Sequence, residues 1–421
     1  MKTDSTELIK KTAAAKKASK VLARLSTQTK NKALHSIADA LIAKQDEIIK
    51  ANKLDCSDAK KSGMDSAMLD RLMLNPDRIK GMASDVRTVA ALPDPVGESI
   101  EARVLPNGLR LEKRRVPLGV ICTIYESRPN VTSDIASLCL KSGNAVVLRG
   151  GKESLRSNSI LAKVIKEAAQ AGGVPGDAIQ FIESTDRTLV YELLKLKNTI
   201  DLVIPRGGEG LVSMVHENAT IPVLASGVGV CHMYVDPTAD LKKAAAIAYN
   251  AKVQRPTVCN ALDCVLVHSK VAGKFLPMMA KELAKANVEM HCDKRALDIL
   301  SGFNSKKAVA SDWGKEFLSL VLAVKVVDSI DEAIEHIEKY GSGHSEAIIT
   351  EDYSAAMRFT EEVDAACVYV NASTRFTDGG QFGLGAEVGI STQKLHARGP
   401  MGVRELTTYK WIILGSGQVR P

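Results

Sequence analysis

The feature that most constrains the fold is a regular alternation of short apolar segments and longer amphipathic segments between residues 120 and 217. Residues 120–125 and 145–148 are typical of strands, and residues 132–141 and 153–169 are typical of helices. Because parallel strands are joined by helical crossovers, this alternation predicts a parallel sheet covered by helices on both faces. The alternation continues through residues 179–182, 187–196, 201–204 and 209–217.

A second set of strand-like and helix-like segments spans residues 230–362, and 421 residues are too many for one hydrophobic core. Residues 6–92, before the first set, have helical periodicity. Residues 100–116 contain two β-like pieces separated by Pro106-Asn107-Gly108, which predicts a β-hairpin. We therefore expect an α/β protein with two parallel-sheet domains and a hairpin.

The composition excludes several classes of function. The net charge of +7 is spread along the chain without a dense Lys/Arg block, and aromatic residues make up only 4%, so nucleic-acid binding is disfavoured. Small anionic ligands fit this charge. The sequence shows no long apolar segment, so we expect a cytoplasmic protein without a membrane span. The eight cysteines have no CxxC spacing, which predicts reduced thiols and no metal site.

Cys259 is the residue that points most directly to chemistry. It lies between an amphipathic segment at 241–251 and a strand-like run at 262–267, with Arg255 and Pro256 just before it. A nearby cation favours the thiolate, which is the nucleophilic form of cysteine. Most cysteines outside disulfides are small buried hydrophobes, so the local sequence fits either a core thiol or a nucleophile in a shaped loop.

Two glycine-containing loops follow predicted strands. Arg149-Gly150-Gly151-Lys152 follows residues 145–148, and Pro205-Arg206-Gly207-Gly208 follows residues 201–204. Ligands of open α/β sheets bind at the carboxyl ends of strands, where glycines allow close approach of the backbone. The two cations of the first loop suit the 2′-phosphate of NADP, and the second loop suits a pyrophosphate or a nicotinamide. No GxGxxG follows the first strand, so a standard Rossmann site is disfavoured and ordinary solvated loops are the alternative.

Other polar residues are candidates for binding the substrate. Asn130 follows the first predicted strand and is a candidate oxyanion donor, or else a turn residue. Arg375, in the turn-rich segment 371–387, and Arg398 are candidate partners of a carboxylate, with surface ion pairing as the alternative for each. No histidine has the spacing of a Cys–His dyad or of a metal ligand set.

Together these segments resemble the aldehyde dehydrogenase superfamily, and within it the reductases that act on γ-glutamyl phosphate in proline biosynthesis. The resemblance covers nearly the whole chain. It is most specific in residues 116–153, 253–262 and 368–402, the last of which ends in Gln393-Lys394-Leu395-His396-Ala397-Arg398-Gly399-Pro400-Met401-Gly402.

The resemblance implies a division of the chain. Residues 1–98, 117–229 and 365–392 would form a cofactor-binding domain, and residues 230–364 a catalytic domain. Residues 99–116 and 393–421 would form an oligomerisation arm, so a homo-oligomer is expected.

The resemblance also implies residue roles. Cys259 would be the nucleophile, Glu316 would hold the nicotinamide ribose, and the loop with Arg149, Gly150 and Lys152 would lie near the adenosine ribose. Arg255 would either keep Cys259 ionised or bind the substrate phosphate. The implied reaction is NADPH-dependent reduction of L-glutamyl 5-phosphate through a cysteine thioester, and glutamate 5-kinase is a candidate partner.

One departure from the superfamily is informative. Hydrolysing members carry a glutamate in a Glu-Leu-Gly-Gly segment that activates water, whereas the matching stretch here, Ala225-Ser226-Gly227-Val228-Gly229, has no acid. Its absence favours the phosphate-dependent reaction, because hydrolysis would waste the thioester. A hydrolytic, NAD-linked aldehyde dehydrogenase and a catalytically silent scaffold with this fold are the alternatives.

Overall fold

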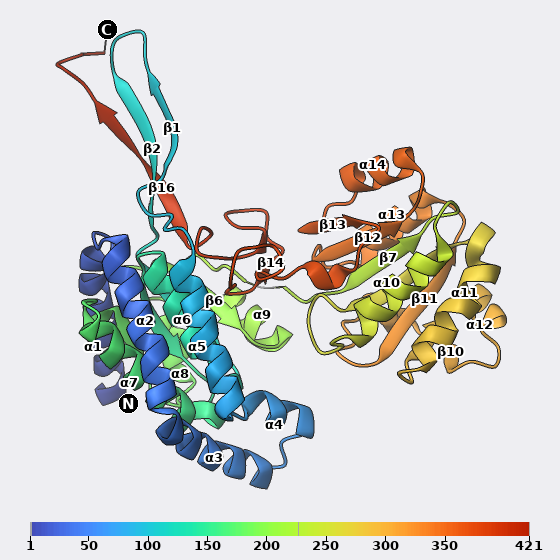
Figure 1. Ribbon diagram of the computed structural model, residues 1–421, viewed down its shortest axis with the longest axis horizontal. Helices are drawn as coiled ribbons and strands as arrows, with labels where there is room; N and C mark the ends of the chain where they lie inside the picture. The colour runs from blue at the N-terminus through green and yellow to red at the C-terminus, as the bar shows by residue number, and fades with distance from the viewer. Residues whose placement is uncertain (1, 226, 421) are drawn as a thin grey trace. The chain divides into compact units, whose positions relative to one another are not determined.

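The computed structural model describes residues 2–225 and 227–420. The chain divides into two compact units, which are described separately (Figure 1). Unit 1 comprises Met1–Ser226, Gly383–Gly389 and Met401–Pro421, and unit 2 comprises Gly227–Phe382 and Ile390–Pro400. Each unit contains a parallel sheet, and unit 1 also carries an antiparallel hairpin, so the predicted fold class is confirmed.

Five helices precede the first strand of unit 1. Their starts follow from capping residues: Ser26 accepts a hydrogen bond from the backbone N–H of Thr29, and Asn75 accepts one from that of Arg78. Their apolar stripes, including Leu34 and Ile37, are buried, as the helical periodicity of this region predicts. The helices are α1 (Lys2–Leu22), α2 (Thr27–Ala43), α3 (Gln45–Lys61), α4 (Ser66–Leu72) and α5 (Pro76–Ala91).

The parallel sheet of unit 1 has the strand order β5-β4-β3-β6. Its strands are β3 (Val120–Tyr125), β4 (Ala145–Arg149), β5 (Ile179–Phe181) and β6 (Leu202–Arg206). The connections contain α6 (Asn130–Lys141), η1 (Lys152–Ser154), α7 (Leu155–Ala171), η2 (Gly176–Ala178) and α8 (Thr188–Leu193), and α9 (Glu209–Asn218) follows the last strand. Because every strand pair is parallel, all carboxyl ends lie at one edge.

Three antiparallel strands form the arm of unit 1, in the order β1-β2-β16. They are β1 (Ser99–Val104), β2 (Arg110–Pro117) and β16 (Thr407–Leu414), and Figure 1 shows them as a long ribbon that extends away from the helices of this unit. Val104, Ile413 and Leu414 are each more than half exposed on the ribbon. The predicted hairpin is therefore present.

Unit 2 contains a parallel seven-stranded sheet with the order β10-β9-β11-β8-β7-β12-β13. The strands are β7 (Cys231–Val235), β8 (Leu262–His268), β9 (Glu289–Cys292), β10 (Ser305–Lys307), β11 (Val321–Val327), β12 (Ser345–Ile349) and β13 (Cys367–Val370). The helices are α10 (Leu241–Val253), α11 (Ser269–Ala284), α12 (Lys294–Ile299), α13 (Ile330–Tyr340) and α14 (Tyr353–Glu362), with short turns η3 (Ala310–Asp312) and η4 (Thr374–Phe376). A two-stranded piece pairs β14 (Ile390–Ser391) with β15 (Gly399–Pro400).

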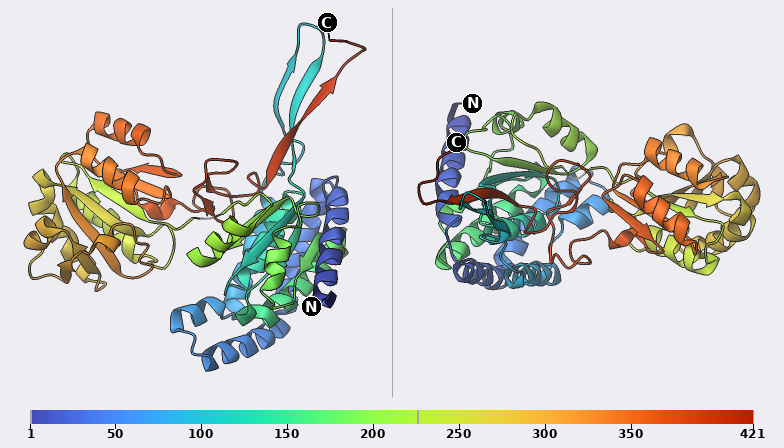
Figure 2. Two further views of the ribbon diagram at one scale, coloured as in Figure 1. Left: turned by 180° about the vertical axis from the view of Figure 1, so that it is seen from behind. Right: turned by 90° about the horizontal axis from the view of Figure 1, so that it is seen from above.

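Two hydrophobic clusters lie on the two faces of this sheet. One contains Val265 and Phe275 and is covered by α10 and α11, and the other contains Leu266 and Phe359 and is covered by α13 and α14. The two views in Figure 2 show helices on both faces. Strands buried on both faces explain why their sequences are continuously apolar.

The structure differs from the expected division of the chain. Residues 365–392 were expected in the cofactor-binding domain, but Cys367–Val370 forms β13, an edge strand of the unit 2 sheet that pairs with β12. Of residues 393–421, expected in the arm, Gly399–Pro400 also belongs to unit 2. Strands β9 and β10 were not expected, because they are short and flanked by polar residues. Within the described residues, no helix is long and apolar enough to cross a membrane.

Candidate active site

Cys259 lies in the loop between α10 and β8 and is partly exposed. Residues just before and at the start of β7 contact its backbone closely. A Cβ atom at Gly229 would lie 1.8 Å from the carbonyl oxygen of Cys259, so only glycine fits there. The buried thiol of Cys231 donates a hydrogen bond to the same oxygen across 3.2 Å. The predicted loop position of Cys259 is thus correct, and the thiol is not packed in the core.

The next residue, Asn260, fastens the loop to the turn-rich segment after β13. Its side-chain amide donates to the backbone oxygen of Thr377 at 2.8 Å, and its backbone oxygen accepts from the hydroxyl of Thr374 at 2.8 Å. The guanidinium of Arg375 donates to the side-chain oxygen of Asn260 and, through Nε, to Gln254 at 2.8 Å. The segment that contains Arg375 therefore belongs to the immediate surroundings of Cys259.

The guanidinium of Arg375 interacts electrostatically with Cys259. Burial lowers the pKa of the Arg375 guanidinium, and the charge of Arg255 lowers it further, whereas Asp378 and Cys259 act in the opposite direction. The guanidinium of Arg375 thus acts on the thiol, and that of Arg255 acts on Arg375. Positive charge stabilises a thiolate and attracts an anionic substrate. Of the predicted substrate-binding residues, Arg375 thus interacts with the predicted nucleophile, and Arg255 interacts with Arg375.

Glu316 lies in the segment between η3 and β11, in the same unit. Its Oε1 accepts a hydrogen bond from the backbone N–H of Gly229 at 3.2 Å. Since Gly229 contacts Cys259 directly, Glu316 and the nucleophile are connected through one residue. The resemblance that singled out Glu316 therefore identified a residue near the thiol.

Arg398, unlike Arg375, has no described contact with the Cys259 loop. Its Nη1 forms an ion pair with Asp364 at 2.7 Å, and its Nη2 donates to the backbone oxygen of Asp364 at 3.2 Å. Lys394 pairs with the same carboxylate at 2.5 Å. The described contacts of Arg398 therefore follow the alternative weighed for it, a surface ion pair, and do not bring it to Cys259.

In unit 1, the loops after β3, β4 and β6 meet at the carboxyl edge of the sheet. Ser127, which has a left-handed φ of 43°, donates from its backbone N–H and its hydroxyl to Glu153 at 2.7 and 2.8 Å. Glu126 accepts from the backbone N–H of Gly208 at 2.9 Å and donates its own N–H to the oxygen of Arg206 at 3.0 Å. The predicted cofactor loops therefore form one connected edge.

Two glycines of these loops pack closely against neighbouring side chains. A Cβ atom at Gly150 would lie 2.1 Å from the Asn158 amide, and one at Gly207 would lie 2.3 Å from the Glu126 carboxylate. At Gly208, by contrast, the space around the Cβ position is open, and this residue precedes the first turn of α9. An open helix amino terminus beside a parallel sheet fits the pyrophosphate of a dinucleotide.

The two cations of the first loop are differently exposed. Arg149 is half-buried, its pKa is lowered by burial, and its Nη2 donates to the backbone oxygen of Thr185 at 3.4 Å. Lys152 is exposed at the start of η1. Both side chains follow β4, at the edge where the sequence predicted them.

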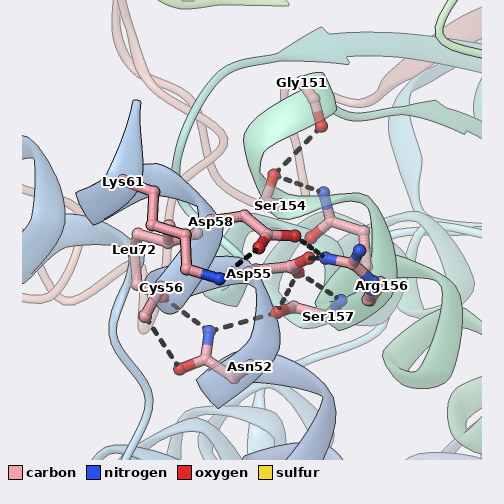
Figure 3. A network of polar contacts seen from close by, with 11 residues as sticks. Asn52, Asp55, Cys56, Asp58, Lys61, Leu72, Gly151, Ser154, Arg156 and Ser157 are labelled. Carbon is pink, nitrogen blue, oxygen red and sulfur yellow. Dashed lines mark hydrogen bonds and ion pairs between the residues drawn. The ribbon is translucent and has the colours of Figure 1, made fainter. Parts of the chain in front are cut away.

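A polar network supports the start of α7, directly after this loop (Figure 3). Asp55, on α3, accepts from the backbone N–H and the hydroxyl of Ser157 at 2.8 and 2.7 Å. Ser154 donates to the backbone oxygen of Gly151 at 3.3 Å. The network thus anchors the loop to the helical layer. A depression of about 380 Å³ nearby contains none of the predicted site residues and is lined by Leu155, Arg156, Ser159, Ile160, Lys163 and Glu183.

Asn130 begins α6, at the carboxyl end of β3. Its side-chain amide donates to Asp134 at 2.9 Å, one turn further along the helix. Burial raises the pKa of the Asp134 carboxyl to about 7, and the hydrogen bond from Asn130 opposes this rise. The orientation of the Asn130 amide therefore depends on Asp134. The role of Asn130 as an oxyanion donor stays a prediction.

A buried cluster in unit 2 has the composition of a metal site. The ligand atoms of His232, Cys264 and His336 lie within 4.8 Å of one another. Burial lowers the pKa of His336 to about 3, so this ring is neutral. Lys325 lies 3.4 Å from its Nδ1 and Cys264 lies 3.8 Å from its Nε2. Because lysine can only donate, the proton of the neutral ring sits on Nε2 and faces the sulfur, which describes a hydrogen-bonded core rather than a ligand set.

Four residues of the site carried no signal in the sequence. Gly229 and Cys231 act on Cys259 from about 30 positions upstream. Asn260 and Ser127 are polar residues in loops, and nothing in their neighbours predicts which partners they reach. The departure at 225–229 was noted for its missing acid, but not for its contact with the nucleophile.

Comparisons with known proteins identify the family of the chain. The sequence matches the aldehyde dehydrogenase family over residues 1–310 and 299–412. A Dehalococcoides mccartyi protein named gamma-glutamyl phosphate reductase is 58% identical over 417 residues, 98% of each chain. One of that name from Caldanaerobacter subterraneus is 55% identical over 406 residues, 96% of this chain and 98% of the relative. The crystal structure of the Thermotoga maritima gamma-glutamyl phosphate reductase matches with a TM-score of 0.96 at 51% identity, covering 99% of this chain and 100% of that one.

The chain belongs to the aldehyde dehydrogenase family and is an enzyme of this class. Within the family, the relatives just described carry the name gamma-glutamyl phosphate reductase, so the resemblance predicted from the sequence is confirmed. A nicotinamide cofactor follows from this membership. An acetylating aldehyde dehydrogenase from Geobacillus thermoglucosidasius, with a TM-score of 0.71 at 19% identity, shares the fold.

Proposed function

We propose that this enzyme reduces L-glutamyl 5-phosphate to L-glutamate 5-semialdehyde, with NADPH as reductant and release of phosphate, as a step of proline biosynthesis. The observation that carries the proposal is the partly exposed Cys259, held by its backbone and acted on by the guanidinium of Arg375, which is itself acted on by Arg255. The names of relatives at 55–59% identity support the same substrate.

The chemistry of the chain begins at the thiolate of Cys259. Its sulfur attacks the acyl carbon of the substrate, a C–S bond forms, and the bond to the phosphate oxygen breaks, so that phosphate leaves with the electron pair. Arg255 and Arg375 compensate the negative charge of the phosphate and of the thiolate. Arg398 remains a candidate for the substrate carboxylate, which would require it to exchange Asp364 for the ligand.

The tetrahedral intermediate carries a negative oxygen that needs hydrogen-bond donors. The backbone N–H of Cys259 is one donor, and the side-chain amide of Asn130 is the proposed second. The hydrogen bond from Asn130 to Asp134 uses one of its two amide protons and leaves the other for an oxyanion.

The cofactor assignment rests on unit 1 and on Glu316. Gly150, Gly207 and Gly208 lie in the loops at the carboxyl edge of the parallel sheet, and Arg149 and Lys152 follow β4 at that edge. We propose that the two cations bind the 2′-phosphate and that Glu316 binds the nicotinamide ribose. When bound, the nicotinamide supplies the hydride that reduces the thioester and releases Cys259.

The segment 225–229 supports reduction over hydrolysis. It contains no acidic residue, and Gly229 is pressed against the backbone of Cys259, where no side chain can be accommodated. A carboxylate that activates water is therefore absent from this segment. The thioester persists until it is reduced.

The reverse reaction provides the test. Oxidation of glutamate semialdehyde, followed by NADPH absorbance, should require added phosphate. Cys259→Ala should abolish it, and Cys56→Ala, a partly buried cysteine on α3, should leave it unchanged. Normal turnover by Cys259→Ala would end the proposal, and equal rates without phosphate would instead identify a hydrolytic aldehyde dehydrogenase.

Assembly and location complete the proposal. We propose a cytoplasmic homo-oligomer assembled through the arm, because β1, β2 and β16 expose apolar side chains such as Ile413 and Leu414. Glutamate 5-kinase is the proposed partner, since its product is the unstable acyl phosphate. Light scattering of the wild type and of an Ile413→Asp variant would test the arm.

A further inference from the structure

A buried ion pair brackets the loop that carries Cys259. Lys252 lies in the last turn of α10 and Asp263 is the second residue of β8. Their side chains are 0% and 3% exposed, and Nζ lies 3.2 Å from Oδ1. Cys259 lies between them in the sequence, so the ion pair closes the loop at its base. Burying two charges costs several kcal/mol of desolvation, so such a pair needs an explanation beyond stability.

Asp263 also reaches a second segment of the site. The same Oδ1 accepts a hydrogen bond from the backbone N–H of Phe317 at 3.3 Å. The Nζ of Lys252 lies 5.8 Å from the centre of the Phe317 ring. Phe317 directly follows Glu316, so the ion pair fixes the backbone beside the residue assigned to the nicotinamide ribose.

The position of Asp263 depends on an irregularity in the sheet. Cys231 pairs with Leu262, but the next residue of β7, His232, pairs with Cys264, so Asp263 is an extra residue in its strand. Consistent with this shift, Leu262 and Val265 belong to the same hydrophobic cluster although they are three residues apart. Such bulges re-aim a side chain and are common beside active sites.

The charges of the site are coupled to the pair. Burial lowers the pKa of Lys252, and Asp263 and Glu316 oppose this. Burial raises the pKa of Asp263 to about 6, and Lys252 opposes this. Glu316 in turn accepts from the N–H of Gly229, which contacts the backbone of Cys259. A closed series of contacts therefore runs from Lys252 through Asp263 and the 316–317 segment back to the nucleophile.

We propose that Lys252 and Asp263 are positioning residues, which hold the Cys259 loop and the Glu316 segment in one fixed geometry for hydride transfer. The inference rests on the proposed function, because it takes Cys259 as the nucleophile and Glu316 as a cofactor ligand. Neither residue of the pair touches the reacting atoms.

The double variant Lys252→Met, Asp263→Leu separates positioning from folding. Replacing a buried ion pair by apolar residues of similar size is often neutral for stability, so this variant should fold. It lacks the acceptor for Phe317. We expect the KM for NADP in the phosphate-dependent oxidation to rise by about tenfold or more and kcat to fall, at a thermal midpoint close to that of the wild type.

A folded double variant with wild-type KM and kcat would overturn the inference. If this variant does not fold, Lys252→Met, Asp263→Asn takes its place, because it leaves no unpaired buried charge and keeps a weaker acceptor for Phe317, with an expected rise of about threefold or more in the KM for NADP. An unchanged KM in that variant would equally overturn it.

A matched control uses another buried ion pair. Lys30 and Asp94, in unit 1, lie 2.5 Å apart with side chains 1% and 8% exposed. Lys30→Met, Asp94→Leu should likewise fold with a thermal midpoint close to that of the wild type, and it should leave the KM for NADP and kcat unchanged. Failure of the proposed function is distinguishable, because then Cys259→Ala keeps its turnover. If Cys259→Ala is inactive and the Lys252 and Asp263 variants are normal, only the positioning role fails.

Discussion

The thiol of Cys231 donates a hydrogen bond to the carbonyl oxygen of Cys259 across 3.2 Å. Two cysteines that are 28 residues apart in the sequence are thus in contact. Their environments differ, and this difference indicates different roles. Cys231 is fully buried, and burial raises its pKa well above the usual value, so it remains a neutral donor. Cys259 is partly exposed and is acted on by the guanidinium of Arg375. One sulfur fixes the backbone, and the other is the proposed nucleophile.

Loss of the Cys231 donor should slow the reaction without abolishing it. A hydrogen bond of this kind contributes about 0.5–1.5 kcal/mol, so Cys231→Ala should lower kcat by about two- to tenfold. Cys231→Ser, which keeps a donor, should lose less. Alkylation by iodoacetamide and peptide mass mapping should modify Cys259 in the native enzyme and spare Cys231. Preferential modification of Cys231 would contradict the assignment.

Gly229 should be intolerant of even one methyl group. Its Cβ would lie 1.8 Å from the carbonyl oxygen of Cys259, so Gly229→Ala must displace the loop. We expect kcat to fall by about 100-fold or more, because a shift of 1 Å at a reacting centre has effects of this size. Gly273→Ala, in the middle of α11 with nothing within 4 Å, is the control and should keep full activity. Steady-state kinetics of the two variants make the comparison.

The cations after β4 should govern the choice between NADP and NAD. Hydrogen bonds to a charged group contribute about 1.5–3 kcal/mol, so Arg149→Ala and Lys152→Ala should each raise the KM for NADP by about tenfold or more. The KM for NAD should change little. Lys166→Ala removes a partly exposed cation on α7 that pairs with Asp177 at 3.7 Å, and it should alter neither value. Equal losses with both cofactors would place the cations away from the 2′-phosphate.

Asp134 should make the stability of the enzyme depend on pH. Burial raises the pKa of its carboxyl to about 7 in the folded chain, above the value of an exposed aspartate. Between these two values the folded state binds more protons, so the free energy of unfolding falls as pH rises from 4 to 8. Asp134→Asn should raise this free energy by about 1–3 kcal/mol at pH 8 and change it little at pH 4. Urea denaturation at the two pH values, with the exposed Asp39→Asn as control, provides the measurement.

Local patterns in the sequence identified the elements but not their long-range contacts. The alternation of apolar and amphipathic segments identifies the central strands of both parallel sheets, because burial on both faces leaves mostly apolar runs such as those of β3 and β8. Pro256 and the polar residues around Cys259 identify a loop. The pairing of Arg398 with Asp364 joins residues 34 positions apart and has no local signature.

Local sequence patterns also failed to predict some short elements. These are the strands β9 and β10 and the contacts of the turn-rich segment after β13. Segments of three or four residues with polar ends give too little periodicity to be recognised. The bulge at Asp263 is also invisible in the sequence, because it depends on the register of β7 against β8. The positions that most constrain Cys259 are therefore those that only the folded chain reveals.

The pairing of β16 with β2 has a consequence for how the protein is made. Thr407 pairs with Pro117, and Leu414 pairs with Arg110, so the ribbon joins segments from early and late in translation. During synthesis the β2 edge stays unpaired on that side until residue 414 has left the ribosome. Unit 2 has all seven strands of its sheet available before then. A nascent chain stalled shortly before residue 407 should therefore expose the unpaired edge of β2, which can pair with other chains. Such a chain should aggregate unless chaperones bind it.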